Sequence, residues 1–182
     1  MKKIKILSLL FCVVMLVAAC HDDEEGPIIP QPREQVGRTV LVYIVGDNGV
    51  NELSDLFKTN FEDMKEGMKE VDYSKCNLVV YSEMVNDVPR LVSLKKQNGK
   101  VVADTLFTYS EQNPLAKEVM SSVISQTVSY FPADSYGFVF LSHSSSWVPA
   151  TNDANSRSIG YYRRTQMNIP DFHDVLLSSF PI

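Results

Sequence analysis

The chain has 182 residues, of which 45% are hydrophobic and 21% charged, and its formal net charge is −5. This composition predicts one globular domain together with a short leader. The sequence contains no extended run of lysine and arginine. We therefore expect neither nucleic acid nor an anionic lipid surface to be a partner.

Residues 1–19 have the pattern of a signal peptide. Three lysines precede an apolar stretch over residues 6–19, which as a helix would be about 21 Å long, too short for a hydrocarbon core of about 30 Å. The stretch ends in the sequence VAAC at Cys20, which resembles the lipobox of bacterial lipoproteins. The resemblance implies that Cys20 is lipid-modified and becomes the mature N-terminus; a plain signal peptide without lipidation is the alternative.

An acidic sequence, HDDEEG, follows Cys20 directly. It resembles the surface-export signal of Bacteroidetes lipoproteins, although a solvated linker explains it equally well. Residues 20–37 are rich in proline and have no hydrophobic periodicity, so we expect an extended, lipidated tether ahead of a domain over residues 38–182. The prediction is a protein anchored by its N-terminal lipid to the bacterial outer membrane, at the cell surface.

The remaining cysteine and histidine residues indicate neither a disulfide nor a metal site. Cys12 lies in the leader and Cys20 is expected to carry lipid, so Cys76 is the one thiol left in the mature chain. No cysteine or histidine pair has the spacing of metal ligands. We therefore expect no metal and no other cofactor.

Hydrophobic periodicity predicts alternating strands and helices from residue 38 onward. In chain order, we expect a strand over 38–45 that ends in Gly46-Asp47-Asn48, an amphipathic helix over about 51–71 and a strand over 76–84. A hairpin over 89–107 follows, with Asn98-Gly99 as its tight turn, and then a helix from Asn113-Pro114 to about Pro132. The last elements are a buried strand over 136–142, a short strand over 159–164 and a short helix over 169–180. The strands are continuously apolar, which is typical of a parallel sheet with helices on both faces. This order predicts an α/β fold.

His143 is the main candidate for chemistry, because active residues of such sheets gather just beyond the carboxyl ends of the strands. It follows an apolar strand, small residues leave room beside it, and Trp147 is near enough to line a pocket. A histidine can exchange protons with a thiol or a leaving amine near neutral pH. The alternative is a structural histidine, with Trp147 as a packing residue.

Other polar residues have plainer explanations. Asp47 follows the first strand and is more simply a helix cap than a substrate contact, and Asp153 is more simply a solvated loop carboxylate. His173 is expected on the surface of the last helix. Ser144 and the two serines after it lack the G-x-S-x-G pattern of a nucleophile elbow, so they indicate a polar loop.

Three segments resemble clostripain-like cysteine peptidases of the C11 family, in clan CD. YFPADSYGFVFLSHSSSW over 130–147 is similar to that family's strand-and-histidine segment, TVLVYIVGDNGVNEL over 39–53 to its opening strand, and MNIPDFHDVL over 167–176 to the helix before its nucleophile strand. The resemblance implies a three-layer αβα, caspase-like fold with a mostly parallel sheet, and cleavage of peptides or proteins after basic residues. It gives His143 the role of the catalytic histidine. Asp47, Ser144 and Trp147 are candidate substrate-binding residues because of their places in the sequence.

The sequence departs from this family in two places. The family's nucleophile is a cysteine in an FDAC-like motif at the end of the following strand, whereas this sequence ends at SSFPI, where that strand would begin. The family's glycine after the histidine is Ser144. Cys76 cannot replace the nucleophile, because it lies at the amino end of its strand, about 20 Å along the sheet from His143.

We therefore expect the N-terminal part of a C11 peptidase, truncated before the nucleophile strand and inactive alone. An incomplete sheet exposes an unpaired strand edge that a second chain could cover. The alternative is a non-catalytic surface lipoprotein that binds peptide or glycan.

Overall fold

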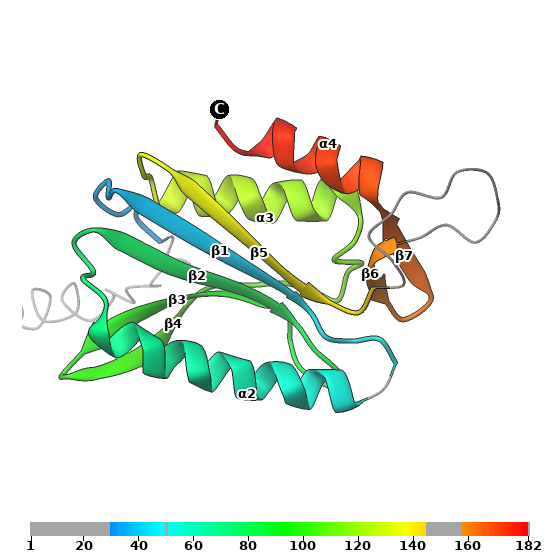
Figure 1. Ribbon diagram of the computed structural model, residues 1–182, viewed down its shortest axis with the longest axis horizontal. Coiled ribbons are helices and arrows are strands. Elements are labelled where there is room, and N and C mark those ends of the chain that lie inside the picture. Colours follow the sequence, from blue (N-terminus) through cyan, green and yellow to red (C-terminus); the bar gives the residue numbers. More distant parts are fainter. Residues whose placement is uncertain (1–29, 50, 145–157, 182) are drawn as a thin grey trace, which may run out of the picture.

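The computed structural model describes residues 30–49, 51–144 and 158–181, except for the side chains of residues 51 and 52. The elements are β1 (Arg38–Val45), α2 (Asn51–Gly67), the short 3-10 helix η1 (Met68–Glu70), β2 (Cys76–Glu83), β3 (Arg90–Gln97), β4 (Lys100–Thr108), α3 (Lys117–Tyr130), β5 (Tyr136–Ser142), β6 (Ser158–Tyr162), β7 (Thr165–Asn168) and α4 (Ile169–Ser179) (Figure 1). Within the described residues, no helix combines the length and apolarity needed to span a bilayer.

The centre of the fold is a five-stranded sheet in the order β4-β3-β2-β1-β5. β1 pairs in parallel with both β2 and β5, whereas the β3–β4 hairpin adds two antiparallel strands. Helices α3 and α4 cover one face of this sheet and α2 covers the other (Figure 1). The three-layer αβα fold, predicted as caspase-like, is confirmed.

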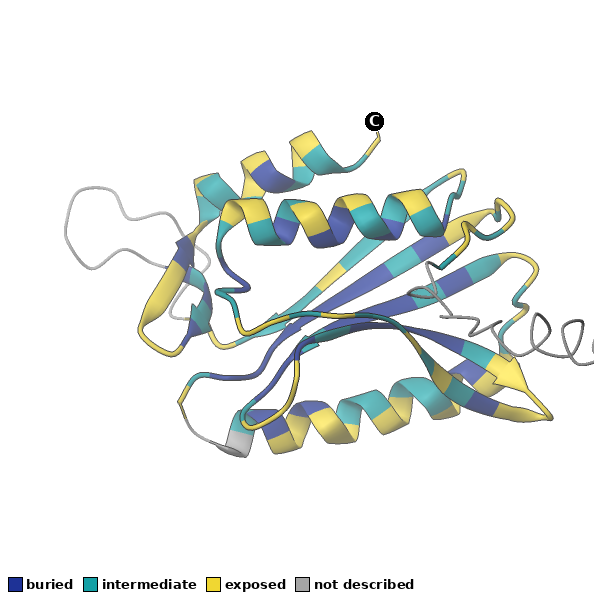
Figure 2. Cartoon of the chain, turned by 180° about the vertical axis from the view of Figure 1, so that it is seen from behind, coloured by how far each residue is buried: buried dark blue, intermediate teal, exposed yellow. Residues whose placement is uncertain are grey.

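β1 explains why the sequence pattern was continuous rather than alternating. Leu41, Tyr43 and Val45 face α3, while Val42 and Ile44 face α2, and all five are buried. The buried residues form a band along the central strands (Figure 2). A strand covered on both faces has no solvent side, and so it needs no polar positions.

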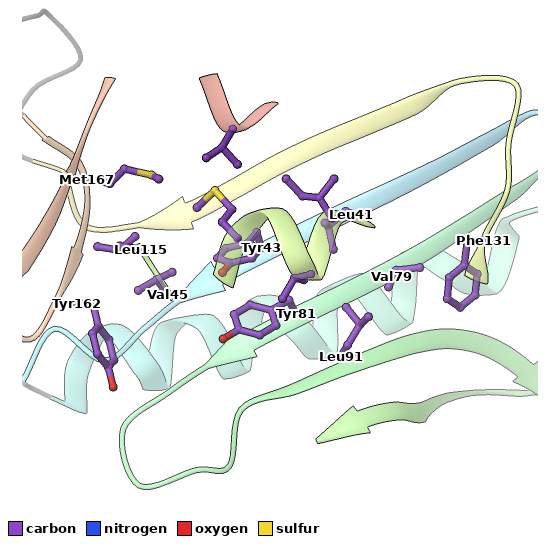
Figure 3. Close-up of a cluster of buried hydrophobic side chains, with 14 residues drawn as sticks. Leu41, Tyr43, Val45, Val79, Tyr81, Leu91, Leu115, Phe131, Tyr162 and Met167 are labelled. Carbon is purple, nitrogen blue, oxygen red and sulfur yellow. The ribbon is translucent and has the colours of Figure 1, made fainter. Parts of the chain in front are cut away.

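A pair of tyrosines anchors the α3 side of the core. The rings of Tyr43 and Tyr81 are stacked with their centroids 4.4 Å apart (Figure 3). The hydroxyl of Tyr43 donates a 2.7 Å hydrogen bond to the carbonyl of Pro114, which satisfies this buried polar group. Burial raises the pKa of both hydroxyls well above the ordinary value.

β5 is less buried than the sequence predicted. Its residues are mostly half-buried, and Val139 is 42% exposed. Within the described part of the chain, β5 pairs only with β1, so its other side is an open edge. On the α2 side, Val139 and Leu141 help to line a hollow of about 510 Å³ together with Val42 and Met64.

The predicted start of one helix was wrong. Helix α3 begins at Lys117 rather than at Asn113, because the Asn113 side chain accepts a hydrogen bond from the Leu115 amide (3.0 Å) and closes a turn instead. The buried stripe of α3 is consequently Met120, Val123, Ile124 and Thr127. The predicted Asn98-Gly99 turn is confirmed, with both residues at positive φ.

The sequence also gave no sign of β7, which pairs with β6 in a separate two-stranded hairpin. This hairpin lies tightly against the main sheet at Gly160. A Cβ atom at that position would lie 2.8 Å from a Leu115 methyl carbon and 2.9 Å from the Phe140 ring. Only glycine lets β6 approach β5 this closely.

Gly160→Ala should therefore destabilise the protein, by roughly 1–3 kcal/mol, because the extra methyl group must displace Leu115 or Phe140. Urea unfolding provides the measurement. Gly67→Ala is the control, since no atom lies within 4 Å of its added Cβ, and alanine should stabilise the end of α2 by up to about 1 kcal/mol. Equal stability of the two variants would contradict the close approach of β6.

Candidate active site

The candidate site lies at the end of the sheet where the carboxyl ends of β1, β2 and β5 meet. In the parallel register, Val45 of β1 pairs with Glu83 of β2 and with Ser142 of β5. Asp47 and His143 therefore follow two neighbouring strands at the same edge, as the sequence predicted. Glu83, the last residue of β2, belongs to the same group.

His143 is exposed and lies against the first strand of the β6–β7 hairpin. Its imidazole meets the ring of Tyr161 edge-on, with the centroids 5.3 Å apart. On one side of it, the Ser142 hydroxyl accepts a 3.2 Å hydrogen bond from the Tyr161 amide. On the other, the Ser144 hydroxyl donates a 2.7 Å bond to the Ser158 carbonyl. The imidazole is thus open to solvent but held between two fixed backbone positions.

Ser144 occupies the position at which the resemblance to C11 peptidases leads us to expect glycine. Among the described non-glycine residues, positive φ occurs only at Asn86, Asn98 and Arg163. The backbone at Ser144 is therefore compatible with a side chain, and no left-handed conformation is required there. Its hydroxyl is already engaged with the Ser158 carbonyl, which gives it a role in fixing the loop.

Several of the predicted residues lie outside the site or outside the described residues. Trp147 and Asp153 lie outside the described residues, so their roles stay predictions. His173 is exposed on α4, with its Nδ1 3.5 Å from the Asp174 carboxylate. Cys20 likewise precedes the described part of the chain.

Cys76 lies at the opposite edge of the sheet from His143. It pairs with Arg38 at the start of β1, whereas Ser142 pairs with Val45 at its end. Seven residues along a strand amount to about 23 Å, far beyond the distance of about 3 Å that a nucleophile and its base require. The Cys76 thiol instead donates a 3.7 Å hydrogen bond to the Asp72 carbonyl.

Asp47 forms an ion pair that the sequence did not predict. Its Oδ2 accepts a 2.8 Å hydrogen bond from Nε of Arg163, and its Oδ1 accepts a 3.1 Å bond from the Gly49 amide. The Arg163 amide also donates to the Asp47 carbonyl (2.9 Å). Arg163 lies at the turn between β6 and β7, and it pairs in addition with Glu111. The carboxylate of Asp47 is only 7% exposed, so its charge is compensated by the guanidinium rather than by water.

Glu83 is a functional candidate that the sequence reasoning missed. It is 2% exposed, and its Oε2 has no hydrogen-bond partner among the described residues. Burial, together with the Asp47 carboxylate, raises its pKa to about 7, while Arg163 opposes the shift. The signal was available, because an acidic residue ends the apolar strand CNLVVYSE just as Asp47 follows β1.

A cavity of about 410 Å³ opens beside these charges. Glu83, Tyr109, Glu111 and Arg163 are among the residues that line it. Within the described part of the chain, no group of three acidic, histidine or cysteine residues is arranged to hold a metal ion. The carboxyl end of the sheet therefore combines one exposed imidazole with a separate cavity on the β2 side that is lined by both acidic residues and Arg163.

A family model for the clostripain peptidases (C11) matches residues 42–182. The chain belongs to the clostripain family. Comparison with curated proteins gives no match. Among solved structures, a cysteine protease from B. fragilis is 41% identical, with a TM-score of 0.57, over 65% of this chain and 98% of its own.

Two further clostripain-family structures are longer than the matched region. A secreted C11 cysteine protease from Bacteroides thetaiotaomicron, in complex with an irreversible peptide inhibitor, is 40% identical with a TM-score of 0.66, over 80% of this chain and 40% of its own. An inactive zymogen C11 protease from Parabacteroides distasonis is 34% identical with a TM-score of 0.58, over 65% of this chain and 34% of its own. The chain thus spans less than half the length of these two relatives.

The carboxyl group of Glu83 should make stability depend on pH. Its pKa rises from 4.5 to about 7 on folding, so the stability it contributes is complete below pH 4.5 and is lost as the pH rises through 7. The loss should be roughly 3 kcal/mol, at about 1.4 kcal/mol per pKa unit. Glu83→Gln stays neutral, and it should remove this loss and exceed the wild type in stability above pH 7.

Urea unfolding at about pH 5 and about pH 8 measures the effect. Glu62→Gln on α2 is the control, because the Glu62 side chain is exposed and should leave the wild-type pH difference unchanged. The same pH difference in both variants would show that Glu83 does not hold a proton in the folded protein.

Proposed function

We propose that this chain is the histidine-bearing part of a clostripain-family cysteine endopeptidase that cleaves peptides after basic residues, with His143 as the general base. One observation carries the proposal: an exposed imidazole follows β5, beside a sheet edge that has no partner in the described part of the chain. A strand added in parallel to that edge would bring its own carboxyl end next to His143, since neighbouring strands lie about 4.8 Å apart.

The nucleophile in this proposal is a cysteine at the end of that added strand, supplied by polypeptide outside residues 1–182. His143 takes the proton from its thiol, and the thiolate attacks the carbonyl carbon of the scissile peptide. Backbone N–H groups stabilise the oxyanion that forms. The imidazolium then gives its proton to the leaving amine, and a water molecule, deprotonated by the same imidazole, hydrolyses the thioester.

The lengths of the relatives support a contribution from further polypeptide. The B. fragilis chain is matched over 98% of its own length but over only 65% of this chain, so it contains little beyond the matched region. The B. thetaiotaomicron chain, matched over 40%, contains much additional polypeptide. A second chain, or a longer form of this one, could therefore complete the sheet.

We further propose that the protein is anchored at Cys20 to the bacterial outer membrane and faces the cell surface. The sequence VAAC followed by HDDEEG supports this placement. The described chain begins at the amino edge of the sheet, where the Arg33 amide donates to the Tyr130 carbonyl (2.9 Å) and Val36 bridges to Ala133. The described chain thus enters the domain at the end of the sheet opposite His143.

Reporter peptides ending in arginine or lysine test the role of His143. The purified protein alone should give no turnover, and mixing it with the unmatched remainder of the B. thetaiotaomicron relative should restore activity. His143→Ala should then lower turnover by about 100- to 10,000-fold, the usual contribution of a general base. His173→Ala removes an exposed histidine from α4 and should have no effect.

Turnover by the protein alone that disappears in His143→Ala would place the nucleophile within these 182 residues. Restored turnover that is insensitive to His143→Ala would refute the assignment of the base. Binding of the peptides without any turnover would favour a non-catalytic lipoprotein.

The open edge of β5 should make the protein associate in solution. Val139 is 42% exposed on this edge strand, and a lysine there should repel an incoming strand. We expect the wild type to self-associate on size exclusion with light scattering, and Val139→Lys to shift the population toward the monomer. Val88→Lys is the control, because Val88 is 51% exposed but lies outside the strands. A wild type that stays monomeric at high concentration would contradict the expectation.

A further inference from the structure

Hairpin β6–β7 forms a strap across the active edge, with one end on β1 and the other on β5. We propose that Arg163 is a positioning residue for His143: its ion pair with Asp47 fixes the strap, and the strap holds Tyr161 against the imidazole. The importance of this arrangement for catalysis rests on the proposed function, whereas the coupling of Arg163 to His143 does not.

The β1 end of the strap is fixed by several contacts to one residue. The Nε of Arg163 lies 2.8 Å from the Asp47 carboxylate, and the Arg163 amide donates to the Asp47 carbonyl. A second guanidinium nitrogen pairs with Glu111. Arg163 itself is at a φ of 51° in the turn. The guanidinium therefore bridges Asp47 and Glu111 and places its positive charge beside the buried Asp47 carboxylate.

The burial of Asp47 makes this ion pair important for the fold of the edge. An exposed pair would contribute little, but the Asp47 carboxylate is 7% exposed and lies near the buried carboxyl of Glu83. Without the guanidinium, two buried acidic groups would remain together with no cation between them. The chain would then have to admit water at this edge, and the strap is the element that would move.

The β5 end of the strap contacts three consecutive residues. Tyr161 bonds through its amide to Ser142 and places its ring against His143, and Ser158 accepts the bond from Ser144. Gly160, which lies between Ser158 and Tyr161, lets β6 lie directly on the Phe140 ring. A displacement of Arg163 is therefore transmitted through Tyr162, the last residue of β6, to Tyr161 beside the imidazole.

The test follows the His143 ring signals by NMR at fixed pH, assigned by their loss in His143→Ala. Tyr161→Leu removes the aromatic ring and shows where the His143 signal lies without it. Arg163→Gln should move the signal in the same direction, and Arg163→Gln with Tyr161→Leu should move it no further than Tyr161→Leu alone. Arg163→Lys keeps the charge and should restore most of the wild-type position.

Arg164→Gln is the matched control, with the same change of charge in the same turn. Arg164 is exposed, and within the described residues no ion pair is formed by it. It should leave the His143 signal in place. The proposal is overturned if Arg163→Gln leaves that signal in place, or if Arg164→Gln moves it equally. A loss of folding in Arg163→Gln is recognised by circular dichroism, and Arg163→Lys then decides: its signal should stay near the wild-type position, and a signal shifted as far as in Tyr161→Leu rejects the proposal.

These readouts need no catalysis. If the reporter peptides show that the proposed peptidase function is wrong, the effect of Arg163 on His143 is still measured. If instead Arg163→Gln leaves the His143 signal in its wild-type position, peptidase activity can still be found. The two proposals therefore fail separately.

Discussion

The parallel pairing of β1 with both of its neighbours is the constraint on which the site depends. It aligns the carboxyl ends of three strands, so that Asp47, Glu83 and His143 lie at the same end of the sheet although they are distant in sequence. The same register places Cys76 at the far edge, and no side-chain movement can bring its thiol to the imidazole. This pairing is stable because both faces of β1 are buried under helices, which requires the continuous apolar sequence of that strand.

The gathering of buried carboxyl groups at one end of the sheet is unfavourable in free energy. Asp47 and Glu83 are both buried, and like charges in such surroundings disfavour each other. The molecule resolves the conflict in two different ways. Asp47 receives the guanidinium of Arg163 from the turn of β6–β7, whereas Glu83 binds a proton near neutral pH. The β6–β7 hairpin thus neutralises a buried carboxylate at one end and contacts the candidate base at the other, which explains why an otherwise separate pair of strands is held so closely to the main sheet.

Much of the fold could be predicted from sequence because it follows from local patterns. The continuous apolar strands, the Asn98-Gly99 turn and the histidine after β5 each have a signal within a few residues. The start of α3 was misplaced because Asn113 can cap a turn as well as a helix, and only the tertiary position of Tyr43, bonded to Pro114, distinguishes the two. Arg163 could not have been identified at all, since its partner lies 116 residues away in the sequence.

The two outer strands of the sheet differ in a way that bears on what completes the fold. β4 is mostly exposed or half-buried and carries Asp104, which pairs with Lys95 (2.7 Å) and Arg33 (3.5 Å). Charged groups of this kind protect an edge strand from pairing with another chain. β5, YGFVFLS, has no charged residue and no proline, and it adjoins the apolar hollow at Val139. An edge without such protection is suited to a further strand, and a parallel strand there would end beside His143. Such a strand would cover the exposed side of β5 and bring a second functional group to the imidazole.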